Sequence, residues 1–274
     1  MNLLGSIRVL LLLASLLAAG LAHAQPAAYQ HYDRGVQLAA QGRLSEAKAA
    51  FDQALQLDPQ AYPVLRCQRV LADVGQGRIK EQTAVLLFRA FLAFNRYKVD
   101  EAILELNRAA ELDPQYALIY SHRADALRDK GRLPEALADY NKAVAVDPRY
   151  AVAYLNRGNL YAQQNEIDRA LADYTKALGL EPRNILAYYS RGNNYGKQGR
   201  YQQAIDDFNA LLAINPAYPH AYVKKGLAYQ ALGRPNDALA AYRAYLQKLN
   251  LEQQDPQQVK WVQDQVNSLQ TPKK

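Results

Sequence analysis

A proline that recurs at a fixed interval is the feature that most constrains the fold of this 274-residue chain. Pro114, Pro148, Pro182 and Pro216 each follow an acidic residue or an asparagine, and they stand 34 residues apart. The same interval links a row of alanines, each followed four residues later by a large side chain, in the pairs Ala102–Leu106, Ala136–Tyr140, Ala170–Tyr174, Ala204–Phe208 and Ala238–Tyr242. Positions that keep one register over this length predict a repeat array and not a single globular core.

Each repeat has the pattern of two helices joined by a short turn. The first helix places an aromatic, a small residue and a second aromatic at regular steps, as in Tyr154, Gly158 and Tyr161. A glycine turn such as Gly199 follows, and the second helix ends where the proline removes a backbone donor. The chain holds only 14 glycines, and half of its residues are apolar, which favours helix over disorder. We therefore expect an all-α protein.

The repeat positions resemble the pattern of the tetratricopeptide repeat family, in which an aromatic, a large, a small and a second aromatic residue follow in order. The full pattern stands three times, at Tyr154-Arg157-Gly158-Tyr161, Tyr188-Arg191-Gly192-Tyr195 and Tyr222-Lys225-Gly226-Tyr229. The resemblance implies a right-handed α-solenoid of helical hairpins, with a concave groove lined by the first helix of each hairpin.

The array is interrupted once, because Pro59 and Pro114 are 55 residues apart, one period plus 21. Tyr97 also stands where the turn glycine of the second unit is expected. We predict a first hairpin in 25–61, with its repeat register at 28–61, and a basic helical insertion in 62–82 with a helix to about Val74. Five hairpins follow, at 83–116, 117–150, 151–184, 185–218 and 219–252. A capping helix at 253–270 and a tail at 271–274 complete the chain that we expect.

The first 24 residues have the pattern of a signal peptide. Arg8 precedes an apolar run from Val9 to Leu21, and the small-x-small step of residues 22–24 predicts cleavage after Ala24. The run is shorter than a comfortable membrane span, so we expect a periplasmic or secreted protein with no integral membrane segment after cleavage; retention as an anchor is the alternative. Cys67 is the only cysteine, which excludes an internal disulfide and favours a buried thiol.

The inventory of reactive residues argues against an enzyme. The histidines after the signal peptide, His31, His122 and His220, stand at unrelated repeat positions, and no metal-ligand spacing or phosphate-binding glycine loop is present. We therefore predict no catalytic residues, no metal and no cofactor. Acidic pairs such as Glu135 with Asp139, or Asp206 with Asp207, fall on the polar face of the amphipathic second helices, so we expect them to be solvated.

The resemblance implies that the groove binds peptides or other proteins through repeat positions two, five, nine and twelve. From these positions we take as candidate groove residues Leu155, Asn159, Tyr189, Asn193 and Arg128. Lys224 is added because it aligns, with Asn159, to the version of the family that clamps a carboxyl-terminal carboxylate; Leu155, Ser190 and His220 stand at the other clamp positions, so that clamp is not reproduced. Asn159 and Asn193 occupy the same position in adjacent repeats, and each amide offers a donor and an acceptor to the backbone of an extended peptide. The alternative, that asparagine is merely tolerated at this position, stays open.

Positive charge is concentrated in the insertion and the helix that follows it, because Tyr62 to Val99 hold seven basic residues and two acidic ones. An anionic partner is one explanation and a solvated basic face is the other; the candidate patch is Arg66, Arg69, Arg78 and Lys80. The sequence thus predicts a non-enzymatic scaffold of the bacterial cell envelope that binds proteins and not nucleic acid. The alternative function is binding of a cell-wall polymer or carbohydrate through the insertion and the tyrosine-rich surface.

Overall fold

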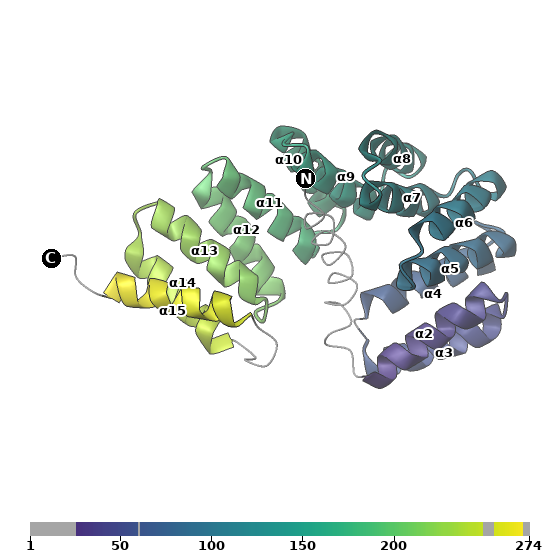
Figure 1. The fold of residues 1–274 in the computed structure, drawn as a ribbon, viewed down its shortest axis with the longest axis horizontal. Coiled ribbons are helices and arrows are strands. Elements are labelled where there is room, and N and C mark those ends of the chain that lie inside the picture. Colours follow the sequence, from purple (N-terminus) through teal and green to yellow (C-terminus); the bar gives the residue numbers. More distant parts are fainter. Residues whose placement is uncertain (1–25, 60, 249–254, 271–274) are drawn as a thin grey trace. The chain divides into compact units, whose positions relative to one another are not determined.

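The computed structural model describes residues 26–59, 61–248 and 255–270, and every regular element in these ranges is an α-helix (Figure 1). The expected signal peptide and the tail 271–274 lie outside the described residues. The chain divides into two compact units, the first ending at Pro148 and the second beginning at Arg149. The helices of the first unit are α2 (Pro26–Ala40), α3 (Leu44–Leu57), α4 (Tyr62–Gly75), α5 (Glu81–Asn95), α6 (Val99–Leu112), α7 (Ala117–Asp129) and α8 (Leu133–Val146).

The second unit continues the same alternation. Its helices are α9 (Ala151–Gln163), α10 (Ile167–Leu180), α11 (Ile185–Lys197), α12 (Tyr201–Ile214), α13 (Pro219–Ala231), α14 (Pro235–Lys248) and α15 (Pro256–Gln270). Within the described ranges, six pairs pack as hairpins: α2/α3, α5/α6, α7/α8, α9/α10, α11/α12 and α13/α14. The predicted all-α solenoid of helical hairpins is confirmed. The helix α4 occupies the insertion and stands outside the hairpins, and α5 begins inside the range that we assigned to the insertion.

All six hairpins place a residue with positive φ at the same turn position. Glycine fills four of the six turns, but Tyr97 and Asn165 adopt the same conformation, with φ of 58° and 63°. A left-handed backbone costs a residue with a side chain about 1 kcal/mol. The ring of Tyr97 is 70% exposed, so packing of the side chain does not offset this cost. The geometry of the hairpin, and not the presence of glycine, therefore sets the turn.

Each hairpin closes around a small residue that faces a large side chain. A Cβ atom added to Gly158 of α9 would lie 2.8 Å from Cε1 of Tyr174 on α10, and one added to Gly192 would lie 2.9 Å from Cε1 of Phe208. Both rings are almost fully buried. The two helices approach closely because the first one has no side chain at this point.

A repeated ion pair holds the middle three hairpins and corrects one expectation. Nε and Nη2 of an arginine on the first helix donate to both oxygens of an aspartate 16 residues later, at 2.7–2.9 Å, in the pairs Arg123–Asp139, Arg157–Asp173 and Arg191–Asp207. The expectation that acidic residues of second helices are solvated is wrong for Asp139 and Asp207, which are 8% and 4% exposed. Two bonds to one guanidinium compensate for their burial.

The same arginines also reach the preceding hairpin. Nη1 of Arg123 donates to Asn107 on α6 at 2.9 Å, and Nη1 of Arg191 donates to Thr175 on α10 at 3.1 Å. Each of these two guanidinium groups therefore joins three helices, which fixes one hairpin against the next as well as closing its own.

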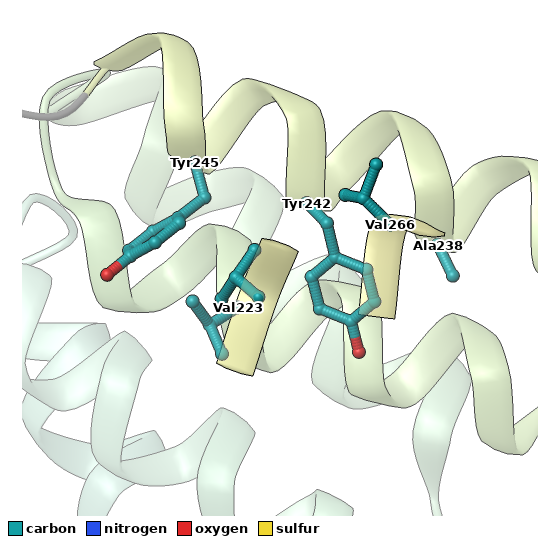
Figure 2. Packing of buried hydrophobic residues seen from close by; sticks show 6 residues of the cluster. Val223, Ala238, Tyr242, Tyr245 and Val266 are labelled. Atoms are coloured by element: carbon teal, nitrogen blue, oxygen red, sulfur yellow. The ribbon is translucent and has the colours of Figure 1, made fainter. Parts of the chain in front are cut away.

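The last hairpin is covered by α15, the expected capping helix. Val262 and Val266 of α15 are buried in a cluster with Tyr242 and Tyr245 of α14 and Val223 of α13. Figure 2 shows Val223, Tyr242, Tyr245 and Val266 of this cluster gathered between the three helices. The polar side of α15 stays exposed, so α15 covers the apolar side chains of the last hairpin and presents a polar surface to solvent.

We predict that Gly158→Ala destabilises the protein by about 1–3 kcal/mol, because the new methyl group overlaps the buried ring of Tyr174. Gly179→Ala on α10 is the matched control, since a Cβ atom there meets nothing within 4 Å. It should stabilise the helix by about 0.5–1 kcal/mol. Urea denaturation followed by circular dichroism measures both, and equal effects of the same sign would contradict the packing argument.

Candidate functional site

The candidate site lies on what we call the first-helix face of the second unit, meaning repeat positions two, five, nine and twelve on α9, α11 and α13. The helix α11 contacts both α9 and α13, so these positions lie side by side. Leu155 and Val223 are buried in this face, whereas Leu186 and Leu227 are 37% and 40% exposed. The face thus offers apolar side chains to a partner between partly exposed amides.

The two asparagines predicted as an equivalent pair have different surroundings. The hydroxyl of Tyr174 donates to Oδ1 of Asn159 at 2.9 Å, so one acceptor of this amide is engaged within its own hairpin. The corresponding ring opposite Asn193 is Phe208, which has no hydroxyl. Asn193 therefore makes no bond of this kind across its hairpin; its side chain interacts instead with the partly exposed hydroxyl of Tyr189 on the same helix.

The Tyr189 side chain packs against neighbouring helices and is also partly exposed on the first-helix face. Its ring lies 5.4 Å from the ring of Tyr218 and 6.3 Å from that of Phe208, so it helps to hold α11 against α12 and the start of α13. Burial raises the pKa of its hydroxyl, and an interaction with the Asn193 side chain opposes the shift. Both side chains are only partly buried, and they form one polar spot on the face.

An open pocket of about 460 Å³ lies where the first-helix face meets α15. The residues that line it are His220, Val223, Lys224, Leu227, Asp255, Gln258 and Trp261. Burial, and then the neighbouring charge of Lys224, lower the pKa of His220, so its imidazole is neutral at neutral pH; the Lys224 side chain beside it is exposed. The sequence placed Lys224 in the groove but did not reveal the pocket, whose other wall comes from the capping helix.

Trp261 forms part of that wall. Its ring packs edge-on against Tyr242 at 5.9 Å, yet 39% of it remains exposed. This end of the second unit therefore presents an aromatic surface.

Arg128 lies in the first unit, apart from the other groove candidates. Its side chain is 10% exposed, and Nη1 donates to the hydroxyl of Tyr140 at 3.3 Å and lies 3.7 Å from Asp125. Burial raises the pKa of Asp125 and raises that of Asp129 to about 6, although Arg128 opposes both shifts. Arg128 thus neutralises a buried acidic cluster.

The four residues of the candidate basic patch do not share one surface environment. Arg66 points inward, with its guanidinium 4.7 Å from the centre of the Phe91 ring, while Arg69 is exposed. Arg78 pairs with the buried Asp73 at 2.7 Å, and Nζ of Lys80 donates to the carbonyl of Leu112 at 2.8 Å. Arg66, Arg78 and Lys80 are thus engaged within the first unit.

In the described parts of the chain, no group of three or more histidine, cysteine or acidic side chains suits a metal ion. None of the helices in the same ranges has the length and apolar content that a membrane crossing requires.

Family models of the tetratricopeptide repeat match much of the chain. They cover residues 28–61, 151–184 and 189–258, and a further repeat model of the same kind covers 124–165. The chain belongs to the tetratricopeptide repeat family. No curated protein sequence matches it.

Several solved structures share the fold. A MamA protein is 24% identical, with a TM-score of 0.56 over 61% of this chain and 92% of its own. PilF of Pseudomonas aeruginosa is 20% identical, with a TM-score of 0.59 over 69% of this chain and 89% of its own. YrrB, described as a tetratricopeptide repeat protein with an unusual peptide-binding site, is 16% identical, with a TM-score of 0.55 over 72% and 99%. At these identities the likeness establishes the fold.

We predict that Asn159→Ala lowers the free energy of unfolding by about 1 kcal/mol, because the buried hydroxyl of Tyr174 loses an acceptor. Ser190 and Asn194 lie near the same hydroxyl and limit the loss. Asn193→Ala should change stability by less than about 0.5 kcal/mol, because its opposite ring is a phenylalanine and its interaction with Tyr189 is partly exposed to solvent. Urea titration of both variants tests the asymmetry; equal losses would show that the two amides are equivalent after all.

Proposed function

We propose that this protein is a non-enzymatic scaffold that binds a peptide segment of another protein on the first-helix face of the second unit. The observation that supports this most is the pairing of exposed apolar side chains with partly exposed amides on three adjacent first helices. Leu186 and Leu227 offer contacts for alternate side chains of an extended peptide, and Asn193 offers a donor and an acceptor to its backbone.

Lys224 favours an acidic or carboxylate group of the peptide on its own side of the pocket. Lys224 is exposed in the pocket between α13 and α15, next to the apolar surface of Leu227 and Trp261. Asp255 lines the same pocket, so the local charge is balanced and the attraction depends on which side of the pocket the ligand meets. The apolar surface supplies affinity and Lys224 supplies orientation.

The alternative function, binding of a cell-wall polymer or carbohydrate through the insertion, has less support. Arg66, Arg78 and Lys80 make contacts within the first unit, so they do not present a joint basic surface. Tyr174 and Tyr242 are buried between helices of the repeat and not displayed as a platform for sugars.

The binding test uses selection from a random peptide library on the immobilised full chain. Leu227→Ala should weaken the selected peptides about tenfold, whereas Leu232→Ala, equally exposed at 40% in the turn after α13, should leave them unchanged. Asn193→Ala should also weaken them, and Asn209→Ala on the exposed side of α12 is its matched control. Peptides that bind all four variants as well as the wild type would refute this site.

We also propose that the protein is exported to the periplasm and acts in the cell envelope. The support is Arg8, the apolar run that follows it and the small residues before Gln25. Protein recovered from the periplasm of a bacterial host should begin at Gln25, as read by amino-terminal sequencing. Protein that begins at Met1 and sediments with membranes would favour the retained anchor.

A further inference from the structure

The helix α4, which has no counterpart in the repeat, lies against the first-helix face of the first unit. The guanidinium of Arg66 stacks on Phe91, at position nine of its repeat, and acts electrostatically on Asp125, at position nine of the next. Cys67 and Arg66 act in the same way on Tyr32, at position five of the first repeat. These are the positions that line the open face of the second unit, so α4 lies where a bound peptide would lie.

The helix is seated as an amphipathic ligand would be. One stripe is buried, made of Pro63, Val64, Cys67, Val70 and Asp73. Tyr62 and Leu65 on its other side are 57% and 44% exposed. Its carboxyl-terminal part is anchored by the hydroxyl of Tyr116, which donates to Asp73 at 2.6 Å, and its middle by Gln68, which donates to Asp52 on α3 at 2.5 Å.

A buried polar atom without a partner lies next to the part of α4 that carries Arg66. His122 of α7 is 7% exposed, its ring packs edge-on against Phe91 at 5.0 Å, and Arg66 acts on it electrostatically. Its Nε2 atom has no hydrogen-bond partner among the described residues. A buried polar group without a partner costs about 1–3 kcal/mol. A ligand that bonds this atom would therefore compete with α4 at an advantage.

We propose that α4 is an intramolecular ligand of the first unit, and that it leaves this face while the hairpins stay folded. Its departure uncovers a second binding surface, suited to an amphipathic helix of the same kind, with an apolar stripe and an arginine that stacks on Phe91. This inference concerns the first unit, and it stands or falls independently of peptide binding by the second.

Cys67 reports directly on the position of α4, because it is the only cysteine of the chain and is fully buried on the seated side. Burial raises the pKa of its thiol to about 12, so a thiol reagent reacts only after α4 leaves. In full-length protein at pH 8, we expect Ellman's reagent to label Cys67 at urea concentrations where the helical signal at 222 nm is intact. Labelling with the same urea dependence as global unfolding would overturn the proposal.

A pair of variants on opposite sides of α4 sharpens the test. Val70→Ala, on the buried stripe, should raise the labelling rate about tenfold without changing the urea midpoint of the 222 nm signal. Leu65→Ala, on the exposed side, should leave the rate unchanged. Equal rates in both variants, or a midpoint that falls with Val70→Ala, would show that α4 belongs to the cooperative core.

Binding to the uncovered surface is tested with a fluorescent peptide of residues 62–75 that carries Cys67→Ser. The peptide should bind full-length protein with Val64→Asp and Val70→Asp, in which α4 cannot bury its stripe, and should not bind the wild type, where α4 competes at high effective concentration. Binding to neither protein while the helical signal is intact would overturn the proposal. If the double variant does not fold, the labelling of wild-type Cys67 decides alone.

Discussion

The close approach of two helices at a residue without a bulky side chain is the constraint on which this structure depends. Gly158 and Gly192 let the buried rings of Tyr174 and Phe208 lie against the backbone of the facing helix. That distance sets the geometry of a hairpin, and repetition of one geometry every 34 residues brings the first helices of the second unit side by side. The first-helix face is a consequence of this packing and not a separate feature.

Charge in this protein is largely used to hold helices together. The arginine of each middle hairpin bonds an aspartate in its own second helix, and Arg123 and Arg191 also bond the preceding hairpin. A bidentate pair at the edge of a close contact fixes the register that apolar packing alone would leave looser. Basic side chains of the insertion are used in the same way, because Arg66, Arg78 and Lys80 contact aromatic, acidic or carbonyl groups of the first unit.

The two units use the same face in different ways. In the second unit the face carries exposed leucines and ends at a pocket walled by α15. In the first unit the corresponding face meets side chains of α4, as the contact of Arg66 with Phe91 shows, and the nearby His122 is buried with its Nε2 atom unpaired among the described residues. The same repeat architecture therefore has an open first-helix face in the second unit and a covered one in the first unit, because the inserted helix α4 shields the latter from solvent.

The sequence by itself determined the helical class, the 34-residue period and the family, because these depend on local rules: proline ends a helix, and small and aromatic residues recur in phase. It also located Lys224 and Asn193 on a surface face, since helical periodicity decides that. The tertiary structure alone decided that Asp139 and Asp207 are buried, that Asn159 is engaged by Tyr174, and that Arg66 points inward. Each of these depends on a partner 15 or more residues away, which a local pattern does not specify. The position of α4 belongs to the same group, because its amphipathic stripe predicts burial but not the surface that buries it.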